Sequence, residues 1–297
     1  DLGNLFLSIS NKNEQQKISN FLDYKTSQFD SIIEKKEKLI EKLEEAKKSL
    51  ISEVVTGKAK IVDGKLVKRD ESEMKDSGDE WLGKISKDWE IAKLLYLSKN
   101  ITDGAHISPD TNNGKKYFVS VRDLKDNKID FENSLLTTKQ NYKYLAKMGC
   151  KPIKGDVLIS KDGTLGETVV VDYNKDFVVA SSLVIIKPLI NVDPFYLEYI
   201  LNTNYYQEQI KMFARGAALP RISISNIKKS KIIYTNDQLE QENIVKFLDK
   251  HIKKLFSTII KTKHQINKIK QAKQSLISEA VTGKIDLRDW EIKEIKN

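Results

Sequence analysis

One ten-residue sequence occurs twice in this chain of 297 residues. Residues 49–58 read SLISEVVTGK, and residues 275–284 read SLISEAVTGK, 226 positions later and with a single difference. Without any gap, the similarity extends over residues 14–58 and 240–284, where 22 of 45 positions are identical. Solenoid units recur about every 20 to 50 residues and stack directly on one another, whereas about 180 unrelated residues separate these two copies. The repeated segment is therefore expected to be a scaffold element that holds a different domain between its copies.

Both copies have the pattern of one long α-helix. Apolar residues recur at spacings of three, four and seven, in the same register in both copies, which indicates a narrow apolar stripe. Neither copy contains proline, and Gly57 and Gly283 stand where a helix is expected to end. We predict helices over residues 14–58 and 239–284, each about 60 Å long at ~1.5 Å per residue. The predicted helix-pairing residues are Leu22, Phe29, Ile33, Ile40, Leu43 and Leu50 in the first copy, and Leu248, Leu255, Ile259, Ile266, Ile269 and Leu276 in the second.

A helix with one narrow apolar stripe needs a partner. Two similar helices can pair about an approximate twofold axis, so the repeat favours an antiparallel coiled coil between its copies. Polar residues interrupt both stripes at equivalent places, first Lys36 and Thr262 and then Lys47 and Lys273. The alternative, in which each helix packs on its own neighbouring domain, stays open from the sequence.

Residues 81–238 have a different composition. All five prolines of the chain fall in this segment. The spacing of apolar residues over 193–213 indicates helix, with Pro194 suited to a first turn. We predict an α+β fold class, in which a mixed α/β domain is flanked by the two long repeated helices. Its β-branched runs, typical of strands, are residues 156–160, 168–172 and 177–187.

The remaining segments connect or terminate these parts. Residues 59–80 are expected to form a linker or a hairpin, and residues 285–297 a C-terminal tail. Residues 288–293 (RDWEIK) repeat the start of the middle domain at 87–93 (KDWEIAK). Residues 1–13 resemble the end of the middle domain, so they are expected to be the tail of a preceding domain of the same kind.

Composition and motifs exclude several classes. The chain has no run of 18 apolar residues and no secretory signal pattern, so neither membrane insertion nor secretion is expected. One cysteine, Cys150, fits a reducing cytosol, and we expect a cytoplasmic protein. Three histidines and one cysteine form no metal-binding pattern, and neither a GxxxxGK(S/T) phosphate loop nor an (N/D)PP(Y/F) methylation motif is present. We expect no metal, no cofactor and no catalytic residue.

The formal net charge of +9 is unevenly distributed. Residues 14–58 are neutral overall, whereas residues 81–238 and 240–284 each carry +6. Such an excess concentrates a polyanion near the protein. Soluble lysine-rich proteins are also common, so charge alone leaves nucleic-acid binding as one alternative.

Several motifs together resemble the specificity (S) subunits of type I restriction and modification systems. They are EQQKISNFLD before the first SLISEVVTGK, WLGKISKDWEIAKL after it, and DGAHISP, VSVRDL, KGDVLISKDGTLGE and RGAALPRISISNIKK in the middle domain. The family arrangement is a first target recognition domain, a central helical region, a second recognition domain and a C-terminal helical region. This chain resembles the last three and begins at the tail of the first. The natural protein is then full length, a half-length form that acts as a homodimer, or a fragment.

The resemblance implies recognition of double-stranded DNA. One recognition domain would read one half of a bipartite target, while the helices set the distance to the second half. Methyltransferase subunits would dock on the helices, bring S-adenosylmethionine and flip out an adenine, and restriction (translocase and nuclease) subunits would join them. A competing interpretation is a coiled-coil assembly protein whose middle domain binds protein instead of DNA.

Base reading needs side chains that make paired hydrogen bonds, chiefly arginine to guanine and asparagine or glutamine to adenine. Three of the five arginines lie in the middle domain, two of them in the loop RGAALPR. For each arginine, a salt bridge or phosphate contact is an equally good interpretation. The segment KDGTLGE is expected to be a tight turn whose lysine can still meet a phosphate. The candidate DNA-binding residues are Asp103, His106, Ser108, Arg122, Lys161, Thr164, Arg215, Arg221, Ser223, Ser225 and Asn226.

Overall fold

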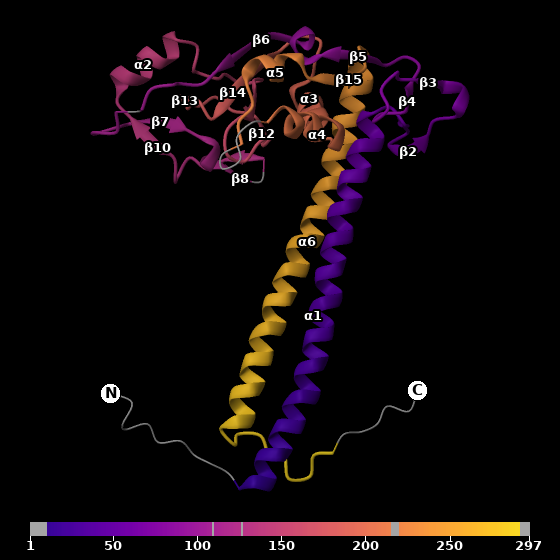
Figure 1. Ribbon diagram of the computed structural model, residues 1–297, viewed down its shortest axis with the longest axis vertical. Coiled ribbons are helices and arrows are strands. Elements are labelled where there is room, and N and C mark those ends of the chain that lie inside the picture. Colours follow the sequence, from indigo (N-terminus) through magenta and orange to yellow (C-terminus); the bar gives the residue numbers. More distant parts are fainter. Residues whose placement is uncertain (1–10, 109, 126, 215–219, 292–297) are drawn as a thin grey trace. The chain divides into compact units, whose positions relative to one another are not determined.

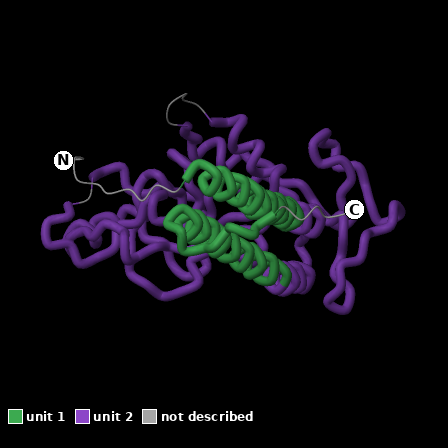
Figure 2. The backbone as a smooth tube through the Cα atoms, turned by 90° about the horizontal axis from the view of Figure 1, so that it is seen from below, with its two compact units in different colours: residues 1–47, 251–297 green, residues 48–250 purple. Residues whose placement is uncertain are grey.

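The computed structural model describes residues 11–108, 110–125, 127–214 and 220–291. The chain forms two compact units (Figure 2). Unit 1 comprises Asp1–Lys47 and His251–Asn297, and unit 2 comprises Lys48–Lys250. The division falls inside both long helices and not at the predicted domain boundaries, because the helix ends in unit 2 carry buried side chains that pack on its core.

The two long helices each contain 44 residues: α1 runs over Lys12–Val55 and α6 over Gln238–Val281 (Figure 1). Both helices end shortly before the glycines of the repeat, Gly57 and Gly283. These glycines have φ angles of 69° and 71°, the left-handed conformation that commonly follows a helix and that glycine adopts without strain.

Within unit 1, residues of α1 contact residues of α6 in reverse order along the chain. Lys36 Nζ donates to Gln265 Oε1 at 2.7 Å, and Lys273 Nζ lies 2.7 Å from both carboxylate oxygens of Asp30. Exposed pairs of this kind contribute less than about 1 kcal/mol each, so apolar burial contributes most of the stabilisation. The stripe residues of this unit are buried (Ile33, Ile259, Ile266) or half-buried (Leu22, Phe29, Ile40, Leu43, Leu255, Ile269, Leu276).

The segment that follows α6 folds back onto α1 within unit 1. The Trp290 ring meets the Phe21 ring edge to face at 5.2 Å between centroids, and the Tyr24 ring lies 6.1 Å away. Leu287 is buried in the same cluster, and Lys17 Nζ donates to the backbone oxygen of Arg288. The part of the predicted C-terminal tail that the structure describes is therefore packed.

The core of unit 2 lies between two small β-sheets. One is antiparallel, with strand order β12-β11-β14-β6, and the other has the order β10-β7-β13, in which β13 is parallel to β7. Buried side chains from both sheets form one apolar cluster. The strands are β6 (Ser98–Asp103), β7 (Lys116–Val119), β10 (Leu135–Thr137), β11 (Val157–Ser160), β12 (Thr168–Val170), β13 (Phe177–Val179) and β14 (Leu183–Pro188).

The segment 59–80 is a hairpin followed by a short extension, not an unstructured linker. Strands β1 (Ala59–Val62) and β2 (Lys65–Lys68) pair in antiparallel fashion. Asp63 and Gly64 connect them with φ angles of 50° and 70°, as in the type I′ turns that suit two-residue hairpins. The other short elements are η1 (Glu71–Glu73), β3 (Met74–Asp76) paired with β4 (Lys84–Ser86), β5 (Glu90–Lys93) paired with β15 (Lys231–Tyr234), η2 (Leu94–Leu97), η3 (Val121–Asp123), and β8 (Leu124–Lys125) paired with β9 (Lys128–Ile129).

Four shorter helices complete unit 2, and each follows a capping side chain that accepts a backbone hydrogen bond. The helix predicted over residues 193–213 is in fact two helices. Thr203 caps the start of the second helix by accepting a hydrogen bond from Tyr206 N at 3.3 Å, so the helical conformation is interrupted at residues 202–203. The helices are α2 (Lys139–Lys147), α3 (Pro194–Leu201), α4 (Asn204–Phe213) and α5 (Ile224–Lys229).

Trp89 joins several elements of unit 2. Its side chain is fully buried, and its Nε1 donates to Glu240 Oε2 at 3.0 Å, while Arg69 Nη2 donates to the other oxygen of Glu240 at 2.5 Å. Its ring lies edge to face with Tyr196 at 6.3 Å. A Cβ atom on Gly57 would lie 3.0 Å from the indole ring, and the φ angle of 69° would strain any other residue there. The indole therefore fixes the end of α1 and the start of α6 to the core.

Glu198 in α3 is a buried carboxyl group without a hydrogen-bond partner at Oε1 among the described residues. Burial, together with the negative charges of Asp249 and Asp172, raises the pKa of Glu198 to about 8. The group is therefore mostly protonated at neutral pH in the folded chain.

The raised pKa predicts a pH-dependent stability. Between about pH 4.5 and pH 8 the folded chain retains a proton on Glu198 that the unfolded chain has released, so the free energy of unfolding falls as pH rises. We expect a loss on the order of 3 kcal/mol from this group between about pH 5 and pH 8, and a clearly smaller loss in Glu198→Gln. Urea denaturation of both proteins at both pH values measures the difference, and equal pH dependence would contradict the assignment.

Candidate functional site

Two segments of unit 2 that are far apart in sequence lie side by side. Residues 161–167 form the loop between β11 and β12, and residues 220–222 lead into α5. Two backbone hydrogen bonds join them, from Gly163 N to Pro220 O (3.2 Å) and from Ile222 N to Lys161 O (2.9 Å). Because these hydrogen bonds fix the two backbones relative to each other, the Cα atoms from which the side chains extend are also fixed.

Arg221 and Asp162 face each other across this pairing. Arg221 Nε donates to Asp162 Oδ1 at 2.6 Å, and Arg221 Nη2 donates to Oδ2 at 3.0 Å. The aspartate hydrogen bond and charge raise the pKa of Arg221 above its usual value. The arginine side chain is nevertheless 63% exposed, against 21% for the aspartate. One edge of the guanidinium group is thus held by the carboxylate, while both N–H groups of Nη1 and one of Nη2 remain available.

Asp103 lies at the end of β6 and contacts two of the candidate residues. Lys161 Nζ lies 3.1 Å from each carboxylate oxygen, and His106 Nε2 lies 2.9 Å from Oδ2. Asp103 reaches this place because the following residue, Gly104, passes so close to Ala180 that a Cβ atom would lie 2.0 Å from the Ala180 backbone oxygen.

The structure corrects one expectation about Lys161. The sequence suggested a tight turn whose lysine can meet a phosphate, but Lys161 is only 5% exposed and its ammonium group is paired with Asp103. The cause is a long-range contact, because the backbone N–H of Lys161 donates to Ser182 O at 2.9 Å and draws the residue inward. A phosphate contact by this lysine would require the buried ion pair to open.

Ser182 also connects the turn that carries Arg122. Val121 N donates to Ser182 Oγ at 3.1 Å, so η3 and the start of the loop 161–167 meet at one serine. Asp103, His106, Lys161 and Arg221 are thereby brought together, with Arg122 on the adjoining turn. Asp162 and Ser182, which hold these residues in place, were missed from the sequence because nothing local distinguishes them from other loop residues.

The other candidates are distributed over neighbouring segments. Ser223 is the N-cap of α5 and accepts a hydrogen bond from Asn226 N at 3.1 Å. Arg215 lies outside the described residues. The side chains of Ser108, Arg122, Thr164, Ser223 and Ser225 are exposed, and that of Asn226 is half-buried.

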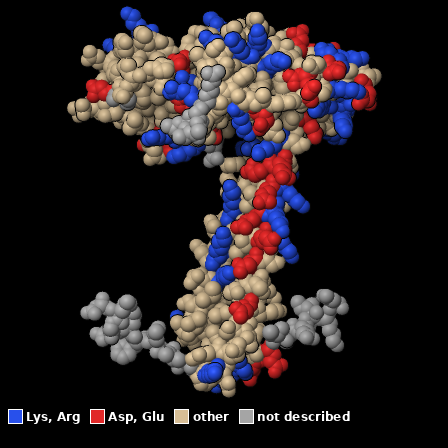
Figure 3. Space-filling view, viewed as in Figure 1, with Lys and Arg blue, Asp and Glu red and all other residues tan. Residues whose placement is uncertain are grey.

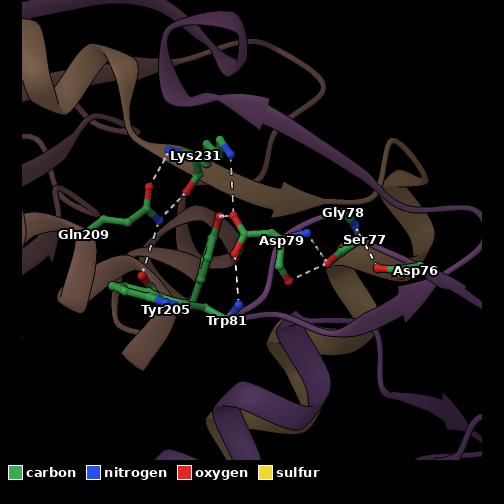
Figure 4. A network of polar contacts seen from close by, with 8 residues as sticks. All are labelled: Asp76, Ser77, Gly78, Asp79, Trp81, Tyr205, Gln209 and Lys231. Carbon is green, nitrogen blue, oxygen red and sulfur yellow. Dashed lines mark hydrogen bonds and ion pairs between the residues drawn. The ribbon is translucent and has the colours of Figure 1, made fainter.

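A second polar network, centred on Asp79, anchors the helix α4 (Figure 4). Tyr205 Oη donates to Asp79 Oδ2 at 3.1 Å, and Lys231 Nζ lies 3.5 Å from the same oxygen. Gln209 exchanges two hydrogen bonds with the backbone of Lys231, at 2.8 and 2.9 Å. Burial and the aspartate raise the pKa of Tyr205, so its hydroxyl remains a donor. The network fixes α4 against β15, just before residues 215–219.

The described residues offer little for metal or nucleophilic chemistry. They contain no cluster of three or more His, Cys, Asp or Glu side chains that could hold a metal ion. Burial raises the pKa of the Cys150 thiol, which disfavours its thiolate. In the same part of the chain, no helix is long and apolar enough to cross a membrane.

The buried ion pair predicts that Lys161 is needed for stability. Lys161→Ala leaves the carboxylate of Asp103 without its main partner, so the free energy of unfolding should fall by about 3 kcal/mol. Lys154→Ala removes an exposed lysine from the preceding segment and should change it by less than about 0.5 kcal/mol. Urea denaturation compares the two variants. Equal stabilities would show that the ion pair does not support the fold.

Comparison with known proteins identifies the family. Residues 87–271 match the model of the type I restriction modification DNA specificity domain. Because this match covers more than half of the chain, the chain belongs to that family. The resemblance predicted from the repeated and middle-domain motifs is thereby confirmed. No curated protein matches the chain.

Solved structures show the same fold. One, described as the structural basis underlying complex assembly and conformational transition of the type I R-M system, matches with a TM-score of 0.69 and 16% identity over 94% of this chain and 62% of that one. The HsdS subunit from Thermoanaerobacter tengcongensis matches with a TM-score of 0.53 and 16% identity over 94% of this chain and 61% of that one. This chain therefore spans about three fifths of the length of each. The predicted α+β class is confirmed.

Proposed function

We propose that this chain reads a DNA sequence as part of the specificity subunit of a type I restriction-modification complex. Family membership supports the class of ligand, and the Arg221–Asp162 pair is the observation that carries the proposal. With one edge held by the carboxylate, the guanidinium group can present its other edge to the O6 and N7 atoms of guanine. The geometry is fixed before DNA binds, so less side-chain entropy is lost on binding.

In this proposal the middle domain reads one half of a bipartite target. The second half is read by another recognition domain, on a longer chain or on a second copy of this one. Methyltransferase subunits supply S-adenosylmethionine and flip the adenine, an unstacking step that costs a few kcal/mol. Restriction subunits complete the assembly, and this chain contributes recognition and no catalytic group.

The long helices act in this proposal as the spacing element. The reverse-order contacts between α1 and α6 in unit 1 support an antiparallel coiled coil. Helices of 44 residues have a length of about 66 Å. The length of the helix pair would then set the distance between the two half-sites.

The role of Arg221 predicts a loss of sequence discrimination. Arg221→Ala should reduce the preference for target over non-target duplex by about 1–3 kcal/mol, roughly 5- to 150-fold, because an arginine–guanine contact is lost. The target is first found by mapping methylated adenines in cells that express this chain with its methyltransferase subunit. Binding of the purified complex to both duplexes, measured over a range of salt concentrations, then gives the preference.

Arg288→Ala is the matched control. Arg288 also forms a bidentate pair, with Asp286 at 2.9 and 2.6 Å, but in unit 1. The control should leave the preference unchanged. An unchanged preference in Arg221→Ala would contradict the role of that residue, whereas absent or salt-insensitive DNA binding by the parent complex would contradict the proposed function itself.

The spacing role predicts a change in the methylated sites. Seven residues inserted after Ala46 in α1 and seven after Leu255 in α6 add about 10.5 Å to the helix pair. Since duplex DNA rises ~3.4 Å per base pair, the spacer between half-sites should lengthen by about three base pairs. Insertion of the same seven residues after Asp63, in the β1–β2 turn, should leave the spacer unchanged. If methylation mapping shows an unchanged spacer in the helix variant, the helices do not set the distance between half-sites.

A further inference from the structure

The positive charge of the middle domain is concentrated in one short stretch. Residues 133–155 contain five lysines and no acidic residue, so they supply five of the six net charges carried by residues 81–238. On the side of unit 2 that carries β1–β4, lysines and acids are interleaved (Figure 3). The ion pairs of Lys60 with Glu73 and of Lys84 with Glu71 are examples of this interleaving. The acid-free stretch is therefore an exception to the local charge balance.

Helix α2 arranges three of these lysines in one row. Lys139, Lys143 and Lys147 stand four residues apart, so they lie on one side of the helix with a rise of about 6 Å between neighbours. All three are exposed, whereas Tyr142 and Leu145, which point to other sides of the helix, are buried in an apolar cluster. The burial of these two side chains fixes which way the lysine row faces.

Among the described residues, no acidic side chain pairs with the lysines of the row. Lys116 and Lys151 lie close to the buried side of α2, at 5.1 and 5.7 Å from the centroid of the Tyr142 ring, and both pair with Asp176 at 3.0 and 2.8 Å. None of the three lysines of the row forms an ion pair with a described carboxylate. Helix α2 itself contains no acidic residue. Three full charges are thus presented to solvent by one rigid element.

We propose that the row Lys139, Lys143 and Lys147 is a second DNA contact, which binds phosphates of the duplex backbone without reading sequence. The inference rests on the proposed function and assigns to α2 a role separate from that of the loops around Arg221. Lysine suits this role because its ammonium is a strongly hydrated point charge on a flexible stem. Tyr144, between these lysines in sequence and 53% exposed, adds a hydroxyl that can donate to phosphate. In Figure 1, α2 and β2 lie at opposite ends of unit 2, so the proposed DNA contact of the row lies far from the β1–β2 hairpin.

The test replaces the row by glutamine, in the triple variant Lys139→Gln, Lys143→Gln and Lys147→Gln of the complex with the methyltransferase subunit. Each phosphate contact contributes about 0.9 to the slope of log affinity against log salt concentration. The slope should therefore become shallower by about 2.7. Affinity at about 0.1 M salt should fall by roughly 100-fold for target and non-target duplexes alike. The preference for target should remain, in contrast to Arg221→Ala.

Two matched variants test whether the expected effect comes from this contact and not from the change in net charge or from a loss of folding. Lys58→Gln, Lys65→Gln and Lys68→Gln remove the same charge from exposed positions at the hairpin end of unit 2 and should change the slope far less. Arginine at the three row positions should restore it. Thermal unfolding midpoints should be unchanged in all three variants. If the parent complex binds DNA, the inference would be overturned by a row variant with the same salt slope as the parent, or by a hairpin control whose slope falls equally. A parent complex that binds no DNA would overturn the proposed function as well.

Discussion

The burial of Trp89 is the interaction on which the arrangement of unit 2 depends. The indole is enclosed by Gly57 of the repeat, by Tyr196 of α3 and by Glu240 in the first turn of α6. Burying a tryptophan side chain of 150–250 Å² contributes about 4–6 kcal/mol, a large part of the 5–15 kcal/mol by which a typical domain is stable. Arg69 supplies the positive charge that Glu240 needs where both are largely removed from water. One side chain thus joins the end of one long helix, the start of the other and the hairpin between them.

The repeated sequence uses a similar arrangement a second time, in unit 1. Trp290, in the second RDWEI-like segment, packs on Phe21 and Tyr24 near the start of α1. In both units the chain leaves a long helix through a left-handed glycine and returns a tryptophan to the first turns of a long helix. The first return is 25 residues longer, since Trp89 follows Gly57 by 32 positions and Trp290 follows Gly283 by seven. The β1–β2 hairpin lies within these additional residues. Trp89 therefore still packs against the start of a long helix despite the longer connection.

Features that depend on local periodicity could be predicted from the sequence, and features that depend on distant contacts could not. The long helices end near the glycines of the repeat, and the strand-like runs contain β11, β12, β13 and β14. The choice between linker and hairpin for residues 59–80 was also within reach, because Asp-Gly between apolar runs is the strongest short hairpin signal. By contrast, the burial of Lys161 follows from the hydrogen bond of its backbone N–H to Ser182 O, and its partner Asp103 is placed by the close passage of Gly104 and Ala180, which are 76 positions apart. The residue pattern within each segment does not predict these contacts. It also does not predict that Ser182 joins η3 to the loop 161–167.

The two kinds of cation in the middle domain are held in physically different ways. Arg221 is fixed on two sides by Asp162 and by backbone pairing, which limits the directions in which its free donors point. The lysines of α2 are fixed only at their Cα atoms, and their side chains keep their rotamer freedom and hydration. A directional donor can distinguish bases, because a wrong base leaves a hydrogen-bonding group unpaired. A mobile charge gains nearly the same free energy from any phosphate within reach. If Arg221 and the lysines of α2 contact one duplex, discrimination and affinity reside in different residues. Substitutions around Arg221 can then change the sequence that is read without weakening binding to the DNA phosphates.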